Sequence, residues 1–245
     1  MKKASNFPVQ KGGLMSSHPG NPVLEFELPD GSTTTVTVKR LFNAGYAGKD
    51  QKEVRAHIEE LAELGVPAPT TTPALYPVSP YLAQQTNHVQ VQHNETSGEA
   101  EWALMIDDQG RELLTVACDH TDRKLETFGV AWSKNASPDV LGKKAWPLSD
   151  IAHRLDEVIL KAWVGQDKTT IQEAPVSALL EPEYWLDVLE QRGERLPGTV
   201  LMSGTITMKP GVDQFSENWG VSLNDVQLGT ISAEYQVSLM PAPIG

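Results

Sequence analysis

Apolar and polar residues alternate along much of this chain with the period of two that is typical of β-strands. The centre of the chain carries two apolar-rich runs that are typical of strands, residues 102–106 and 112–117. Between them lies Asp107-Asp108-Gln109-Gly110, which has the composition of a tight turn with glycine available for a left-handed conformation. The sequence therefore predicts an antiparallel hairpin at the centre of the chain.

The register of this hairpin brings acidic residues together. A three-residue loop would pair Asp107 with Arg111, and the same register places Glu99 opposite Asp119. Glu101 lies two residues from Glu99 on the same strand face, about 7 Å away at a rise of about 3.3 Å per residue. Three carboxylates that converge repel each other unless a positive charge lies among them. A hard divalent cation, Mg²⁺ or Mn²⁺, prefers oxygen ligands and is the expected occupant.

Two alternatives stay open for this acidic group. Glutamates at alternate strand positions are commonly the solvated face of an antiparallel sheet. In addition, a register slip of one residue would turn Asp119 to the other face. Against the first alternative, Asp119 ends an apolar run and begins a dense polar segment, His120-Thr121-Asp122-Arg123, where a simple turn would suffice.

The same reading of periodicity and turn residues predicts elements elsewhere in the chain. They are a small hairpin over residues 23–38, a helix that starts at the N-cap Asp50 and ends at Gly65, a strand over 128–132, a helix over 183–191 and two closing strands over 215–237. Residues 1 to about 21 lack periodicity and are interpreted as a loose arm. The fold class predicted is α+β and mostly β.

Composition narrows the classes of function. The chain has 245 residues with a net charge of −12 at pH 7, which argues against nucleic acid as a partner. No window approaches the roughly 20 apolar residues of a membrane span, so neither membrane insertion nor secretion is expected. A single cysteine, Cys118, excludes intrachain disulfides and is typical of a cytoplasmic protein. Cys118 is a poor nucleophile candidate because the adjacent Asp119 opposes thiolate formation.

Two segments resemble the metal-binding motifs of the fumarylacetoacetate hydrolase superfamily. Glu99-Ala100-Glu101 is similar to its Glu-x-Glu strand, and Asp119-His120-Thr121-Asp122-Arg123 is similar to its Asp-x-Ser/Thr-x-Arg segment. The resemblance covers roughly residues 40 to 238 and implies a mixed β-roll with few peripheral helices. It implies metal ligands at Glu99, Glu101 and Asp119, and substrate binding by Arg123. Residues 1–40 would be an arm with a small β-hairpin element, and 41–245 the catalytic domain.

Further segments follow in the order of that family. His57 and Glu60 lie three residues apart on the predicted helix, where a carboxylate can orient an imidazole, and they resemble the family's catalytic His and Glu. The alternative is a surface helix with scattered charges. Lys134 resembles the catalytic lysine. Tyr46 and the segment from Leu196 to Thr205, with Gly204, resemble the parts that bind substrate.

The resemblance implies a metal-dependent hydrolase that cleaves a carbon–carbon bond in a small anionic oxo acid of the acylpyruvate or 1,3-diketo acid type. A decarboxylase of oxaloacetate type, a hydratase or an isomerase on the same scaffold is the alternative, because fold alone does not choose among these reactions. A protein that binds an oxo acid without turnover is a further alternative, favoured by the short connection between Glu101 and Asp119. The family also implies a homodimer.

Overall fold

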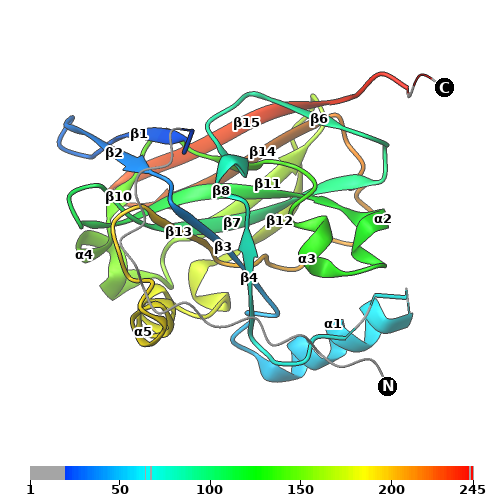
Figure 1. Cartoon of the computed structure of the whole chain (residues 1–245), viewed down its shortest axis with the longest axis horizontal. Coiled ribbons are helices and arrows are strands. Elements are labelled where there is room, and N and C mark those ends of the chain that lie inside the picture. Colours follow the sequence, from blue (N-terminus) through cyan, green and yellow to red (C-terminus); the bar gives the residue numbers. More distant parts are fainter. Residues whose placement is uncertain (1–19, 64, 67, 243, 245) are drawn as a thin grey trace.

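The computed structural model describes residues 20–63, 65, 66, 68–242 and 244, without the side chains of residues 57, 60 and 61. The chain folds into two mixed sheets and a small hairpin, with short helices at their periphery (Figure 1). This architecture confirms the predicted α+β class with a predominance of β-structure. No helix in these residues is long and apolar enough to cross a membrane.

The central hairpin has the register that the turn residues predict. It consists of β7 (Thr96–Ile106) and β8 (Glu112–Asp122), in which Glu99 is the partner of Asp119. Gly110 has a φ of 84°, and the Asp107 amide donates to the carbonyl of Arg111 at 2.9 Å. The Asp107 carboxylate also accepts hydrogen bonds from the amides of Gln109 and Arg111. These local bonds close the loop at one length and thereby fix the pairing along both strands.

The hairpin lies in the larger of the two sheets. Its strand order is β4-β3-β13-β7-β8-β9-β5, with β10 also paired to β8. The other strands of this sheet are β3 (Arg40–Gly45), β4 (Ala74–Val78), β5 (Ala83–Gln84), β9 (Asp139–Leu141), β10 (Trp146–Pro147) and β13 (Thr199–Met202). Strand β3 runs parallel to β13, and β5 runs parallel to β9, whereas the remaining pairs are antiparallel.

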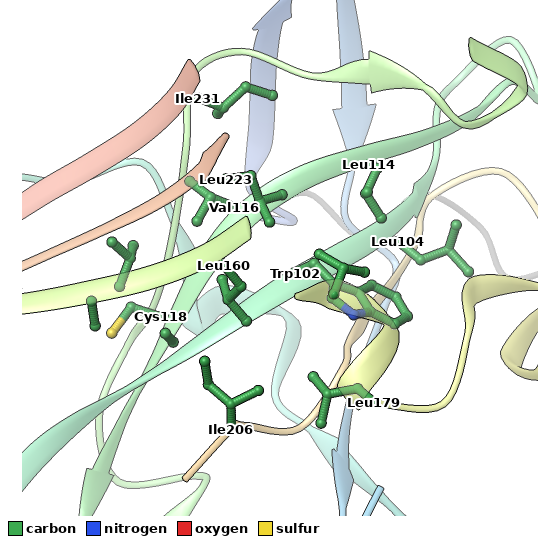
Figure 2. Packing of buried hydrophobic residues seen from close by; sticks show 14 of the residues in the cluster. Trp102, Leu104, Leu114, Val116, Cys118, Leu160, Leu179, Ile206, Leu223 and Ile231 are labelled. Carbon is green, nitrogen blue, oxygen red and sulfur yellow. The ribbon is translucent and has the colours of Figure 1, made fainter. Parts of the chain in front are cut away.

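The second sheet has the order β12-β11-β14-β15-β6 and packs against one face of the first. Its strands are β6 (His88–Val91), β11 (Ile159–Val164), β12 (Thr169–Pro175), β14 (Asn218–Asp225) and β15 (Gly229–Leu239). Figure 2 shows the interface, where Trp102 and Leu114 of the hairpin meet Leu160 and Leu223 of the second sheet. The predicted closing strands over 215–237 correspond to β14 and β15.

A smaller apolar cluster covers the opposite face of the first sheet. The N-terminal hairpin, β1 (Val23–Glu27) and β2 (Thr33–Thr37), contributes Phe26 and Val36, which pack with Met105 and Leu113. Both faces of β7 and β8 are therefore covered, and all eleven residues of β7 are buried. This burial decides the environment of the acidic residues, because no face of this hairpin strand is left to solvent.

The helices lie at the edges of the sheets. They are α1 (Gln51–Glu63), α2 (Arg123–Glu126), α3 (Val130–Ser133), α4 (Leu148–Ile151) and α5 (Pro182–Arg192), with 3-10 turns at Pro80–Leu82, Ala152–Arg154 and Val176–Ala178. The Asp50 carboxylate caps α1 by accepting from the Lys52 amide at 2.7 Å, as predicted. Gly193, in the left-handed conformation, ends α5.

The strand predicted over residues 128–132 is wrong. The chain forms α2 and α3 there, because the Asp122 carboxylate accepts from the Leu125 amide at 2.9 Å and caps a helical turn where a strand would have had to continue. Phe128 and Trp132 are 65% and 64% exposed. The apolar composition of this segment therefore does not reflect a buried strand, and Lys134 follows a helix instead of a strand.

Candidate functional site

Three carboxylates meet on one face of the central hairpin. One ligand atom each of Glu99, Glu101 and Asp119 lies within 4.8 Å of the others. Glu99 is 8% exposed, and Glu101 and Asp119 are fully buried. The solvated-face alternative therefore does not apply, because Lys134, Arg123 and Asn43 lie against these carboxylates. The register slip does not occur either.

Lys134 supplies a positive charge to this acidic group from the end of α3. Its Nζ donates to Asp119 Oδ2 at 2.6 Å and to Glu99 Oε2 at 3.3 Å. The lysine is 5% exposed, so the contact is a buried ion pair. Because a buried charge is tolerated only with partners of opposite charge, the carboxylates and this ammonium hold one another in place.

Arg123 occupies the other side of Glu99. Its Nη1 lies 2.9 Å from Glu99 Oε1 and 3.1 Å from Glu126 Oε2, and its Nε donates to Ser97 Oγ at 2.7 Å. The guanidinium is thus anchored at two of its nitrogens. The other terminal nitrogen, Nη2, makes no hydrogen bond to the described part of the chain. Arg123 could therefore bind an anion through Nη2.

The loop after β13 orients Glu101. The Gly204 amide donates to Glu101 Oε2 at 2.8 Å. Gly204 has a φ of 79°, and a Cβ at this position would lie 2.9 Å from the carbonyl oxygen of Ala44, so only glycine fits. The neighbouring Thr205 hydroxyl donates to the Ala100 carbonyl and accepts from Gln172 Nε2, each at 2.8 Å. These contacts fix the loop against β7.

The oxygens that remain without partners fit a cation. The buried atoms Glu101 Oε1, Asp119 Oδ1, Asn43 Oδ1 and both carboxylate oxygens of Asp139 have no hydrogen-bond partner among the described residues. All of them are acceptors, and buried acceptors without partners are costly. A hard divalent cation with its waters would satisfy such a set, and Glu99, Glu101 and Asp119 are the residues that would hold it.

The protonation states of the site follow from burial and from the neighbouring charges. Burial raises the pKa of Glu101 well above its ordinary value, and the neighbouring carboxylates add to this effect while Lys134 opposes it. Burial would also raise the pKa of Glu99, but Arg123 and Lys134 outweigh it and lower the pKa to about 2. For Lys134, the carboxylates outweigh burial and raise the pKa, so its amine is an ammonium at neutral pH.

These shifts predict how the stability of the metal-free protein depends on pH. Because the raised pKa of Glu101 means that the folded state binds a proton more tightly than the unfolded state, stability falls as pH rises above its ordinary pKa of about 4.5. We expect a higher melting temperature at pH 5 than at pH 8 in the presence of a chelator. Glu101→Gln should reduce this difference, and an unchanged pH dependence in this variant would contradict the assignment. Scanning calorimetry measures both.

Comparison with known proteins places the chain in a family. Residues 44–235 match the family model described as "Protein of unknown function (DUF2848)". The chain belongs to this family. The matched region contains both strands of the hairpin, Lys134 and the Gly204 loop, so the candidate site lies within the part that defines DUF2848, apart from Asn43. Among curated proteins, no sequence matches this chain.

Solved structures show which fold this DUF2848 protein has. A 2-keto-3-deoxyarabinonate dehydratase matches with a TM-score of 0.62 at 16% identity, over 84% of this chain and 75% of that chain. A 2-keto-3-deoxy-D-arabinonate dehydratase complexed with magnesium and 2,5-dioxopentanoate matches with a TM-score of 0.58 at 17% identity, over 86% of this chain and 77% of that chain. A protein from Oleispira antarctica described as a fumarylacetoacetate isomerase/hydrolase matches with a TM-score of 0.60 at 16% identity, over 87% of this chain and 99% of that chain. The fold is that of the fumarylacetoacetate hydrolase superfamily, as the motifs predicted.

The remaining predicted site residues of this DUF2848 chain are Tyr46, His57 and Glu60. Tyr46, with a φ of 56°, is half-buried near the site, and burial together with Tyr76 and Glu126 raises its pKa to about 12. His57 and Glu60 fall in α1, but their side chains lie outside the described part of the structure. Their predicted catalytic roles stay predictions.

Two residues of the site were missed by sequence reasoning. Asn43 donates from Nδ2 to Asp119 Oδ2 at 3.0 Å, and Asp139 is the strand partner of Asp119 on β9. Both are fully buried. In the sequence, Asn43 lies within the apolar run 41–44, and Asp139 lies beside the apolar residues Val140 and Leu141. These positions could have indicated site residues, because polar residues in buried strands usually have a specific partner.

Proposed function

We propose that this protein is a divalent-cation-dependent enzyme that acts on a small oxo acid, and that it hydrolyses a carbon–carbon bond in an acylpyruvate or 1,3-diketo acid. The observation that carries the proposal is the buried group of Glu99, Glu101 and Asp119 with the Lys134 ammonium beside it. One structural neighbour is complexed with magnesium and 2,5-dioxopentanoate, which is an oxo acid, and this supports the substrate class. Mg²⁺ and Mn²⁺ are the proposed cofactors.

When bound, a divalent cation would supply positive charge that polarises the carbonyl of a 2-oxo acid and stabilises negative charge that develops on its oxygen. The chain's own residues provide the remainder of the electrostatics. Lys134, an ammonium at neutral pH, donates hydrogen bonds and stabilises an enolate oxygen next to the acidic group. Arg123 binds the substrate carboxylate with the terminal nitrogen that its protein partners leave available.

Hydrolysis also requires a base that activates water. In the proposed mechanism His57, oriented by Glu60, removes a proton from water, and the water oxygen adds to the distal carbonyl carbon. The carbon–carbon bond then breaks, and the electron pair passes to the enolate that Lys134 and Arg123 stabilise. Protonation of the enolate carbon completes the reaction and releases two acids, or an acid and a ketone.

Decarboxylation of an oxaloacetate-type acid is the second candidate. It needs a polarised carbonyl and a stabilised enolate but no activated water, and the described residues at the hairpin suffice for it. A hydratase or an isomerase would use the same enolate stabilisation. A homodimer and a cytoplasmic location stay predictions from the sequence.

Turnover of a substrate panel tests the proposal. The full-length chain with Mg²⁺ or Mn²⁺ is expected to cleave an acylpyruvate, detected by mass spectrometry of both products, and to lose this activity in chelator. Restoring the cation should restore turnover. Decarboxylation of oxaloacetate without acylpyruvate cleavage would favour the second candidate. Absence of turnover across the panel, with proof that the cation is bound, would favour the binding protein without catalysis.

A further inference from the structure

Asp139 is a buried carboxyl group of this region whose oxygens lack a hydrogen-bond donor among the described residues. It begins β9 directly opposite Asp119, which in turn lies opposite Glu99, so a row of three carboxylates crosses three neighbouring strands. Lys134 bridges Glu99 and Asp119 but makes no hydrogen bond to Asp139. Neither oxygen of Asp139 accepts a hydrogen bond from a donor among the described residues, the side chain is fully buried, and burial together with the adjacent Asp119 raises its pKa well above the ordinary value.

Strand geometry places the Asp139 side chain on the same face as the acidic group. Residues that are direct partners on antiparallel strands point to the same side of a sheet. Consistent with this, Leu141, two residues further along β9, packs in the same apolar cluster as Ala117, whereas Val140 packs in the cluster on the opposite face. The unpartnered oxygens of Asp139 therefore share a side of the sheet with the unpartnered Oδ1 of Asp119.

A buried carboxyl oxygen without a donor is unfavourable, so a donor is expected for Asp139 when the protein is in its working state. Asp139 is not in the set of ligand atoms that lie within 4.8 Å of one another. It is therefore placed beyond the first ring of ligands. Mg²⁺ and Mn²⁺ keep several of their waters in protein sites, and such waters donate hydrogen bonds to carboxylates that lie behind the ligands.

We infer that Asp139 is a positioning residue of the cation site, which accepts hydrogen bonds from waters of the bound cation's hydration shell. Asn43, which donates from Nδ2 to Asp119, has in its Oδ1 another buried acceptor without a partner in the described residues. This inference rests on the cation dependence proposed above and extends it: the site holds a hydrated cation through four carboxylates, three as ligands and one through water.

Mn²⁺ binding to the metal-stripped full-length chain tests this role. Isothermal titration with MnCl₂ is expected to give a dissociation constant about 10- to 100-fold higher for Asp139→Asn than for wild type, which is the usual effect of losing an outer partner. The electron paramagnetic resonance spectrum of bound Mn²⁺ should change as well. The amide of asparagine at position 139 could donate a hydrogen bond to Asp119, whereas the side chain of alanine cannot. Asp139→Ala should nevertheless weaken Mn²⁺ binding to a similar extent.

Asp107→Asn is the matched control. Asp107 is equally buried and lies at the other end of the same hairpin, but its oxygens accept bonds from Thr34 and Arg111. This variant should melt at a lower temperature and bind Mn²⁺ within about twofold of wild type, whereas metal-free Asp139→Asn should melt no lower than wild type.

Two results would overturn the inference and are distinguishable from each other. If wild type binds Mn²⁺ and folded Asp139→Asn and Asp139→Ala bind it within twofold of wild type with the same spectrum, Asp139 has no part in the site and the proposed function stands. If wild type itself does not bind Mn²⁺, the proposed cation dependence fails and the role of Asp139 fails with it.

Discussion

Glu101→Ala is expected to abolish the thermal stabilisation that Mn²⁺ gives to the wild-type protein. Glu101 has one oxygen held by the Gly204 amide and the other without a partner, and it is fully buried between Glu99 and Asp119. Removing it takes away one of three ligands. A ligand present at 100 times its dissociation constant stabilises the folded state by about 2.7 kcal/mol. For a domain of this size, that corresponds to a rise in melting temperature of roughly 5 to 11 °C.

A melting series with increasing Mn²⁺ measures this effect for wild type and variant side by side. Glu112→Ala is a suitable control, because Glu112 lies on the same hairpin but forms an ion pair with Arg195 away from the acidic group. The control should keep the full gain from Mn²⁺. An equal gain in wild type and Glu101→Ala would show that Mn²⁺ binds elsewhere and would remove Glu101 from the site.

His57→Ala is expected to suppress acylpyruvate hydrolysis by roughly 100- to 10,000-fold, the usual effect of losing a general base. Decarboxylation of oxaloacetate needs no activated water, so the same variant should lower its rate only weakly. Steady-state rates on both substrates, measured at saturating Mn²⁺, give the ratio that distinguishes the two reactions. Glu60→Gln should reproduce the selectivity at a smaller magnitude if Glu60 orients the imidazole.

Glu101→Ala is the control for this comparison, since loss of the cation site should abolish both reactions. If His57→Ala hydrolyses the best substrate within a few-fold of wild type, His57 is not the base. The helix α1 (Gln51–Glu63) would then be a surface helix with scattered charges, and a cation-dependent decarboxylase or isomerase would describe the protein better.

The central hairpin and its register are determined by the sequence alone. The turn chemistry of Asp107 and Gly110 is local, and a period of two then fixes which residues share a face along both strands. For this reason the convergence of Glu99, Glu101 and Asp119 could be predicted without any long-range information. The caps of α1 and α5 were predictable for the same reason, since a cap involves neighbours within a few residues.

The environment of these carboxylates was decided only by the tertiary structure. A strand with alternating glutamates is solvated in one context and buried in another, and here Lys134 and the Gly204 loop, which the fold brings against the hairpin, enclose the face that the pattern alone leaves open. Asn43 and Asp139 come from strands that are remote in sequence, so neither the amide bond to Asp119 nor the row of carboxylates could be derived from spacing. Local periodicity fixes faces and registers, whereas burial and partners depend on which strands the fold brings alongside.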